Sequence, residues 1–288
     1  MKKYTRNIRY FIEYTAFYLA YLFFRYIPFS SLCIQPLGLL GYKLNIRKDI
    51  VIRNLGRAFG KEFRDEKLVK KIYINAAHVL IDLFLIDKKL DYTIENFRVI
   101  GELKNKNTPV VCVSCHLGNW EIMPRIFIQN GVPGTVIAKP IHNPFVNRFI
   151  AKKRLSAGVN IVYTQKRGLV RLITALKNNH TIGFLMDQNA GKRGIPIPFF
   201  GTSASTFTGP AVICLKWKLP LFFAYSVRNR DGSYRIILDD LILPEQYIDS
   251  QQSREKNMEN LLIMINQKIE QAVKKHPEQW FWFHRRWQ

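Results

Sequence analysis

The chain has 288 residues, of which 48% are hydrophobic and 13% aromatic, and this composition excludes an intrinsically disordered protein. Lysine and arginine number 44 against 21 aspartates and glutamates, so the formal net charge is +23. A field of this sign favours polyanionic partners such as nucleic acid, an anionic membrane surface or an acidic carrier protein. The length suits one large α/β domain or two small ones.

The first 42 residues have the character of a membrane-anchoring helical segment. A basic opening precedes an aromatic-rich apolar run, and no small-residue cleavage site follows it, so an ordinary secretory signal peptide is disfavoured. Glu13 and Arg25 bracket only about 16 Å of apolar helix, against a hydrocarbon core of about 30 Å. Pro28 and Pro36 then interrupt the next apolar stretch, whose flanks are basic. We expect residues 1–42 to lie in or dip into an anionic leaflet; the alternative is an apolar helix that packs on its own domain.

The remaining residues, 43–288, are expected to form a single α/β domain, because no repeat, low-complexity tract or flexible linker divides them. Residues 61–87 have helical apolar spacing, and short apolar runs then alternate with helical patterns. The runs typical of buried strands are 108–115, 134–138, 160–163, 181–186, 219–226 and 234–238. The helical patterns among them are 122–129, 144–157, 168–178, 209–217 and 252–275. This order predicts a mostly parallel central sheet covered by helices on both faces.

Polar or charged residues follow four of the predicted strands. His116 ends the first of them, Lys139 and residues 165–168 follow the next two, and Asp187 follows the fourth. The carboxyl ends of parallel strands meet at one edge of a sheet, and ligands bind in the crevice outside that edge. A purely structural layout would not require this arrangement, so we expect a functional site there.

Several common sites are missing from the sequence. It contains no G-x-S-x-G elbow, no G-x-x-x-x-G-K-[ST] phosphate loop and no G-x-G-x-x-G fingerprint. The histidines show no H-x-x-x-H spacing, so we expect neither a metal ion nor another cofactor. Cys112 and Cys115 form a C-x-x-C within an apolar strand rather than at a helix start. We therefore expect the four cysteines to be buried thiols and not a redox pair.

The stretch SCHLGNWEIMPR, residues 114–125, holds a candidate catalytic pair. His116 lies in a predicted strand-to-helix turn, Gly118 gives that turn freedom, and Glu121 falls in the first helical turn, where a carboxylate suits the helix dipole. A sharp turn would fold the carboxylate onto the imidazole, fix its tautomer and stabilise the imidazolium. Cys115 directly precedes His116, but neighbours on a strand point to opposite faces, so the two are not a credible nucleophilic pair. The imidazole would instead act on a hydroxyl supplied by a substrate. The structural alternative is that Glu121 only caps its helix.

Four motifs resemble one protein family. HLGNWE closely resembles the H-x-x-x-x-[DE] box of glycerolipid-type acyltransferases, in particular that of the lipid A late acyltransferases (the lauroyl/myristoyl transferase family). KPIHNPFVNRFI, residues 139–150, is similar to a family segment that usually has Arg where this chain has Lys139. Residues 187–211 and 277–287 resemble two further family blocks, and we expect the aromatic side chains of the last one to pack. The resemblance covers nearly the whole chain.

The resemblance implies a membrane-bound transferase on the cytoplasmic face of the bacterial inner membrane. It would move a fatty acyl group from acyl carrier protein to a hydroxyl of a lipid A precursor, without a covalent enzyme intermediate. His116 would be the general base and Glu121 its orienting partner. Negative charge that grows on the thioester oxygen needs hydrogen-bond donors, and the backbone N–H groups near Gly118 and Asn119 are candidates.

Three cations are expected to bind the anionic head group of the acceptor, namely Lys139, Arg148 and Arg167. Lysine cannot make the bidentate grip of arginine, so the details at Lys139 differ from the family pattern. Asp187 is expected to help to hold the site, and the alternative for it is a helix or turn cap. For Arg148, Arg154 and Arg167 the alternative is a solvated charge that faces the membrane.

Three other functions compete with this one. The nearest is the same chemistry on another glycolipid, such as a phosphatidylinositol mannoside, with acyl-CoA as the donor. A nucleic-acid binder would suit the charge, but the basic residues are scattered and the apolar N-terminus would have no role. A non-enzymatic membrane scaffold would not need His116 or Glu121. The expected partners are therefore acyl carrier protein or acyl-CoA, a glycolipid acceptor and an anionic membrane surface, with no nucleic acid.

Overall fold

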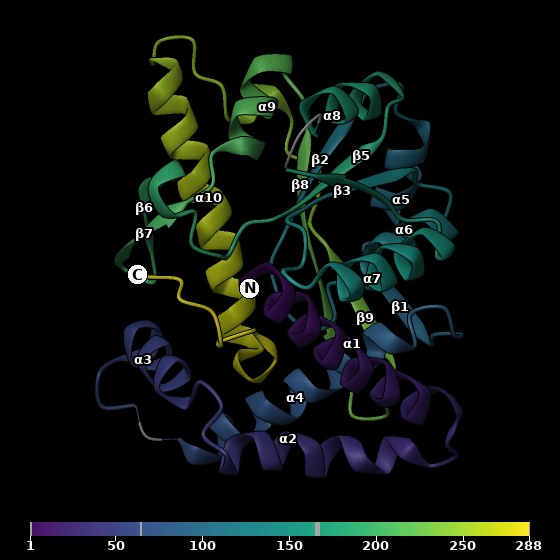
Figure 1. Ribbon diagram of the computed structural model, residues 1–288. Coiled ribbons are helices and arrows are strands. Elements are labelled where there is room, and N and C mark those ends of the chain that lie inside the picture. The colour runs from purple at the N-terminus through teal and green to yellow at the C-terminus, as the bar shows by residue number, and fades with distance from the viewer. Residues whose placement is uncertain (1, 64, 165–167, 288) are drawn as a thin grey trace.

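The computed structural model describes residues 2–63, 65–164 and 168–287, with side chains from residue 6 onward. Its main sheet has seven strands in the order β1-β9-β8-β2-β5-β3-β4 (Figure 1). The five strands from β8 to β4 are parallel to one another, whereas β9 and β1 run the opposite way. The strands are β1 (Tyr92–Glu95), β2 (Val110–Ser114), β3 (Gly134–Ala138), β4 (Asn160–Tyr163), β5 (Thr181–Leu185), β8 (Leu221–Arg228) and β9 (Tyr234–Leu238). The predicted α/β class with a mostly parallel sheet is confirmed.

A second, two-stranded sheet was not predicted from the sequence. It pairs β6 (Ile195–Phe199) with β7 (Thr202–Thr206) in an antiparallel hairpin. Pro196 and Pro198 lie within β6, and a proline cannot donate to a strand ladder, so the pattern argued against a strand there. A two-stranded ribbon tolerates them because each strand has one unpaired edge. All six predicted strands of the main sheet are present close to their predicted bounds.

Helices cover both faces of the main sheet, as predicted. Val111 and Val113 of β2 pack into one core, together with buried residues of α3, α4, α9 and α10, while Val110 and Cys112 pack into another core with α5 and α6. Successive side chains of a strand point to opposite faces, so burial of every residue in β2 requires cover on both. The helices are α1 (Lys2–Tyr26), α2 (Ile34–Lys43), α3 (Lys48–Phe59), α4 (Glu66–Phe84), α5 (Arg98–Asn105), α6 (Met123–Gln129), α7 (Pro144–Ser156), α8 (Gly168–Lys177), α9 (Gly209–Trp217) and α10 (Arg254–Lys275).

Helix α1 runs from near the middle of the molecule toward the end where α2 packs on α4 (Figure 1). Tyr21 and Phe24 of α1 pack against Phe84 of α4, and Tyr21 also contacts Phe149 of α7. Other apolar side chains of α1, such as Phe11, are exposed. In the ranges that the structure describes, no helix is both long and apolar enough to span a membrane. The membrane anchor over residues 1–42 stays a prediction.

The cysteines are free thiols, and Cys112, Cys115 and Cys214 are buried as expected. Burial raises the pKa of Cys112 to about 12, so this thiol stays protonated. The expectation was wrong for Cys33, which is exposed because it ends the short 3₁₀ helix η1 (Ser30–Cys33) between α1 and α2. Within the described part of the chain, no group of three His, Cys, Asp or Glu residues could hold a metal ion.

Candidate active site

His116 and Asp187 face each other at the carboxyl edge of the main sheet. His116 follows β2 and Asp187 follows β5, and these two strands are paired in register, with Ser114 beside Leu185. The imidazole Nδ1 lies 2.7 Å from Oδ1 of Asp187, and the backbone N–H of His116 donates to Oδ2 at 2.8 Å. A carboxylate that contacts both the ring and the backbone of one histidine fixes the orientation of the imidazole.

Asp187 is ionised although it is fully buried. Burial by itself would raise its pKa, but the charge and hydrogen bonds of His116 outweigh burial and lower the pKa well below its usual range. Trp280 also donates its indole N–H to Oδ2, at 2.7 Å. Since an ionised carboxylate only accepts hydrogen bonds, Nδ1 of His116 carries a proton, and in the neutral ring Nε2 presents a lone pair.

The imidazole of His116 also contacts an amide, at Nε2, and two aromatic rings. The side-chain nitrogen of Gln188 lies 3.2 Å from Nε2 and can donate to its lone pair. The ring of Trp120 packs edge-on against the imidazole with centroids 4.6 Å apart, and Phe281 lies at 6.3 Å. About 13% of the His116 side chain remains exposed, so the imidazole is largely enclosed but reaches the surface.

The C-terminal segment, residues 277–287, holds the ends of β2 and β5 in place. The backbone N–H of Phe281 donates to the carbonyl oxygen of His116 at 2.8 Å. His284 donates from Nε2 to the carbonyl oxygen of Asp187 at 2.6 Å. Burial lowers the pKa of His284 to about 4, so this second histidine is neutral at pH 7. The segment therefore supplies polar contacts to the site as well as the aromatic packing that the sequence predicted.

Arg286 is a buried residue whose contacts the sequence did not predict. Its guanidinium donates to the carbonyl oxygen of Ser205 at 2.5 Å and to the hydroxyl of Thr206 at 2.8 Å, and it lies over the ring of Phe199. Burial lowers its pKa to about 10, which leaves it protonated at pH 7. It also reaches the carbonyl oxygen of Gln188 at 3.4 Å. Arg286 thus ties the loop after Asp187 to β7.

Glu121 contacts α7 and not His116, which corrects the sequence prediction. Its two carboxylate oxygens accept from Nε and a terminal nitrogen of Arg154, at 2.8 and 2.6 Å. Burial disfavours the charge of Arg154, but the carboxylate outweighs that effect and raises the pKa of the guanidinium. Arg154 is accordingly part of a half-buried ion pair rather than a solvated charge.

The start of α6 explains why the predicted Glu121–His116 contact does not form. The helix begins at Met123, so Glu121 precedes it instead of lying in its first turn. The backbone N–H of Glu121 donates to the side-chain oxygen of Asn119 at 3.1 Å, which closes a local turn before the helix. This turn directs the carboxylate toward Arg154, and Asp187 takes the position beside the imidazole.

The backbone N–H groups of Gly118 and Asn119 are already bonded, so they are poor candidates for binding a thioester oxygen. The N–H of Gly118 donates to the carbonyl oxygen of Gln279 at 2.9 Å, and that of Asn119 donates to the hydroxyl of Ser226 at 2.8 Å. Gly118 has φ +58°, and an added Cβ would lie 2.0 Å from the carbonyl oxygen of Ser226. The turn therefore requires glycine, and its two N–H groups hold it against the C-terminal segment and β8.

A second carboxyl group, that of the partly buried Asp82 of α4, bonds a side chain of the same turn. One of its oxygens, Oδ2, accepts from the side-chain nitrogen of Asn119 at 3.2 Å and from the hydroxyl of Tyr234. Burial raises the pKa of Asp82, and the hydrogen bonds from Tyr234 and Asn119 with the charge of Arg228 only partly offset this. Helix α4 and strand β9 thereby hold the side chain of Asn119, which accepts the hydrogen bond from the backbone N–H of Glu121.

No described hydrogen bond or ion pair joins His116 to Lys139 or Arg148, two of the cations predicted for an anionic head group. Lys139 follows β3 and Arg148 lies on α7, and both side chains are exposed. Arg167 lies outside the residues that the structure describes. Arg154, one position after Lys153 on α7, places its guanidinium against Glu121 in the turn after β2.

The sequence profile described as "Bacterial lipid A biosynthesis acyltransferase" matches residues 1–288. The lipid A biosynthesis palmitoleoyltransferase of Escherichia coli (strain K12) is 22% identical over 276 residues, which cover 90% of this chain and 86% of the relative. The lipid A biosynthesis lauroyltransferase of the same strain is 24% identical over 251 residues, which cover 83% of this chain and 78% of the relative. Among solved structures, the crystal structure of the 1-acyl-sn-glycerophosphate (LPA) acyltransferase, PlsC, from Thermotoga maritima matches with a TM-score of 0.39 and 16% identity, covering 86% of this chain and 97% of that chain.

Proposed function

The chain belongs to the bacterial lipid A biosynthesis acyltransferase family and is an acyltransferase, and we propose that it moves a fatty acyl group from an acyl carrier protein thioester to a hydroxyl of a lipid A precursor. The single observation that carries the mechanism is the His116–Asp187 pair at the carboxyl edge of the sheet. We assign His116 as the general base and Asp187, in place of Glu121, as the carboxylate that orients it.

The proposed reaction passes directly from donor to acceptor. Asp187 keeps a proton on Nδ1 of His116, so Nε2 is free to remove the proton of the acceptor hydroxyl. As that proton leaves, the hydroxyl oxygen attacks the thioester carbonyl carbon. The tetrahedral intermediate collapses, the C–S bond breaks, and the imidazolium returns the proton to the leaving thiolate. The ionised Asp187 stabilises the imidazolium in between. A positioned base of this kind contributes roughly 10²–10⁴ in rate.

Gln188 is our candidate donor for the thioester oxygen. Its amide nitrogen lies 3.2 Å from Nε2 of His116, where the acceptor hydroxyl must enter. The side chain must therefore turn aside when the acceptor binds, and its N–H would then point into the space where the tetrahedral oxygen develops charge. The backbone of Gln188 is held by Arg286, which supports a fixed pivot for that movement.

Glu121 acts on the site through Arg154 in this proposal. Their bidentate ion pair joins the turn after β2 to α7, and it keeps a guanidinium beside the site. A half-buried cation in that place can attract the anionic parts of both substrates, so we assign Glu121 and Arg154 as positioning residues. The exposed Lys139 and Arg148 remain proposals for contacts with the acceptor's head group further out.

We further propose that the protein works on the cytoplasmic face of the bacterial inner membrane. Exposed apolar side chains on α1, on η1 and on α2 support contact of this end of the molecule with lipid. The net charge of +23 favours an anionic leaflet and an acidic carrier protein. The two relatives from Escherichia coli are named for different acyl groups, so the acyl chain transferred here has to be measured.

The deciding experiment incubates the purified protein with lauroyl, myristoyl and palmitoleoyl acyl carrier proteins and a lipid A precursor, and reads the product by mass spectrometry. The same acyl-CoA esters form a second donor arm. We expect wild type to add one acyl mass and His116→Ala to lose at least 10²-fold in rate. His180→Ala is the matched control, because His180 precedes β5 at the opposite edge of the sheet and bonds Thr135. No acylated product from wild type, or an unchanged rate in His116→Ala, would refute the mechanism.

A further inference from the structure

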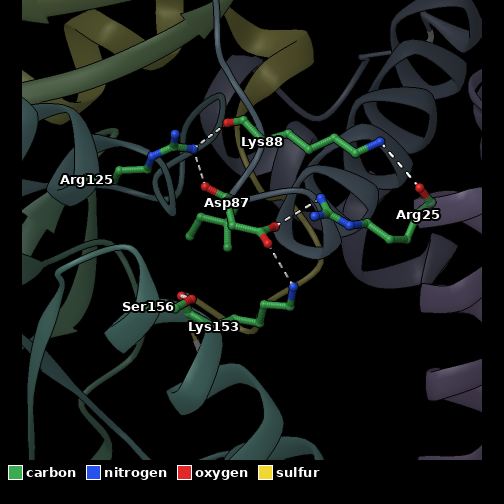
Figure 2. Close-up of polar contacts among 7 residues, drawn as sticks. Arg25, Asp87, Lys88, Arg125, Lys153 and Ser156 are labelled. Carbon is green, nitrogen blue, oxygen red and sulfur yellow. Dashed lines mark hydrogen bonds and ion pairs between the residues drawn. The ribbon is translucent and has the colours of Figure 1, made fainter.

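Four basic side chains gather where the end of α1 meets the ends of α4 and α7 (Figure 2). Arg25 belongs to the last turn of α1, Lys88 follows α4, Arg125 lies on α6 and Lys153 on α7. Asp87 supplies a carboxylate among them, and Figure 2 shows its two oxygens directed at two different cations. This cluster joins the N-terminal helix to the elements that carry the site.

Asp87 is already neutralised by two of the four cations. Its Oδ1 lies 3.2 Å from Arg25 and its Oδ2 lies 3.2 Å from Lys153. Burial would raise the pKa of this carboxyl, but the hydrogen bond and charge of Lys153, with the charge of Arg25, outweigh that effect and lower it. Asp87 therefore stays ionised, and its two oxygens pair with Arg25 and Lys153 rather than with Lys88 or Arg125.

The other two cations contact neutral oxygens in the described structure, those of the backbone and, for Arg125, also that of the Gln129 side-chain amide. The Lys88 ammonium lies 3.4 Å from the carbonyl oxygen of Arg25, a long and weak contact. Arg125 donates to the carbonyl oxygens of Ile86 and Lys88, and so holds the loop that carries Asp87. Neither is paired with a carboxylate among the side chains that the structure describes, so the cluster keeps an excess of positive charge.

A cavity with a mixed polar and apolar lining adjoins these cations. Its volume is about 320 Å³, and Arg25 and Lys88 both line it, between the end of α1, η1 and the end of α4. Apolar side chains also line the cavity, among them Ile27, Ile81 and Leu85. We call this cavity the α1–η1 pocket. Its size lies within the range of small-molecule sites, near the lower end.

The rim of the α1–η1 pocket carries an aromatic side chain in an uncommon backbone conformation. Phe29 has φ +60°, a region that bulky residues rarely adopt, and 82% of the residue is exposed. Leu32 of η1 is also exposed. An apolar rim that faces outward next to two cations matches an amphiphile, with its anionic group inside and its hydrocarbon at the rim.

We propose that the α1–η1 pocket binds the phosphate group of a lipid, with Arg25 and Lys88 as its direct donors and Phe29 against the acyl part. Phosphate suits this pair because arginine offers a planar fork and lysine a mobile point charge. A free phosphate ion would make no use of the apolar wall, and an acidic peptide would make little use of the rim. The shared chemistry is a phosphate ester that carries hydrocarbon.

Two sources could supply this phosphate, and the second rests on the proposed function. One is a phospholipid of the bilayer, which would seat the N-terminal end of the molecule. The other is the phosphorylated acceptor glycolipid itself, because Lys153 of the cluster precedes Arg154, which holds Glu121 at the site. The basic cluster beside the pocket and the site are therefore linked through helix α7.

The test measures binding of dihexanoyl phosphatidic acid, below its aggregation concentration, to the full chain by titration calorimetry. We expect saturable binding by wild type and about tenfold weaker binding in Lys88→Gln, a change of about 1.4 kcal/mol. Lys89→Gln is the matched control. It removes the same charge at the neighbouring residue, whose side chain does not line the pocket. Equal losses in both variants would mean diffuse surface attraction and would overturn the proposal, as would absence of saturable binding.

A second variant tests the apolar half of the pocket. Phe29→Asn preserves the backbone, because asparagine tolerates positive φ, and it removes the ring. We expect this variant to bind dihexanoyl phosphatidic acid several-fold more weakly while its melting temperature does not fall. If inorganic phosphate bound the pocket as tightly as dihexanoyl phosphatidic acid does, the result would contradict a site for an amphiphile.

Competition then separates the two sources. Displacement by a lipid A precursor, but not by the same precursor after phosphatase treatment, assigns the pocket to the acceptor. Stronger displacement by dihexanoyl phosphatidylglycerol assigns it to bilayer phospholipid. Neither arm involves acyl transfer, so a chain that binds phosphate lipid and transfers nothing would refute the proposed function and leave the pocket standing.

Discussion

Two aspartates contact the turn after β2, and their pKa values shift in opposite directions. Asp187 contacts His116, Trp280 and the backbone of the turn, and its pKa is lowered. Asp82 contacts the turn on its other side, through Asn119, and its pKa is raised. Both carboxyl groups are desolvated, so burial alone cannot explain the difference. The partners decide it, because a histidine can carry positive charge whereas an amide and a phenol cannot.

Asp187 and Asp82 have different roles in the proposed mechanism. A carboxylate that stays ionised against an imidazole can stabilise the imidazolium during proton transfer, so Asp187 belongs to the proposed chemistry. Asp82 is one side chain further from the imidazole and bonds only neutral groups, Asn119 and Tyr234. Its part is to keep the turn in shape. Substitution of each carboxyl group by its amide should therefore have very different consequences.

We expect Asp187→Asn to have the largest effect, a fall in kcat of about 10⁴-fold, as is known for the same change in an Asp–His pair of other enzymes. The amide would place an N–H against Nδ1 and move the imidazole proton to Nε2, so the base would be lost. The measurement is the rate of acyl transfer at saturating donor and acceptor. Asp239→Asn is the matched control, because Asp239 pairs with Lys268 on the surface. A kcat within tenfold of wild type would remove Asp187 from the mechanism.

Glu121→Gln should have an intermediate effect, with kcat/KM lowered about tenfold to 10²-fold. The change breaks a half-buried ion pair and frees Arg154, but it leaves His116 and Asp187 in contact. A double-mutant cycle with Arg154→Gln is the sharpest measurement, because residues that act as one unit give non-additive effects. We expect the double variant to be no slower than the slower single variant. Fully additive losses would instead mean that Glu121 acts on the site independently of Arg154.

The strand pattern predicted the arrangement of the site better than the motif spacing did. Runs of buried β-branched residues placed the ends of β2 and β5 at one sheet edge, and His116 and Asp187 lie there together. The interval from His116 to Glu121 could not show where α6 begins, and the helix start at Met123 decides which way the carboxylate points. Periodicity determines elements, but the contact of a side chain depends on the turn geometry between them.

The C-terminal contacts were beyond prediction for a different reason. Trp280 and His284 reach Asp187 across 93 and 97 residues of sequence. Nothing local in residues 277–287 reveals that their backbone runs beside the end of β2, since this depends on how α10 packs on the sheet. The hairpin of β6 and β7 was missed because of its two prolines. Its link to the site through Arg286 followed only from the assembled fold.

The pH dependence of stability should separate the two aspartates by sign. The lowered pKa of Asp187 means that the unfolded chain binds more protons, so its contribution is present above the unfolded value of about 3.9 and is lost as pH falls through the folded pKa. The raised pKa of Asp82 means the reverse: its contribution is present below about 3.9 and is lost as pH rises through the folded pKa.

Asp82→Asn should consequently have the smallest effect of the three. Both described bonds of this carboxyl group go to the same oxygen, so the amide oxygen of asparagine can accept them both. We expect less than a tenfold change in kcat and a free energy of unfolding within about 1 kcal/mol of wild type near pH 4. Because the variant does not ionise, its stability relative to wild type should rise as pH increases toward 7, as measured by urea unfolding at several pH values. If the stability of the variant relative to wild type instead decreased as pH increases, Asp82 would be a charged partner like Asp187. The distinction between the two carboxyl groups would then fail.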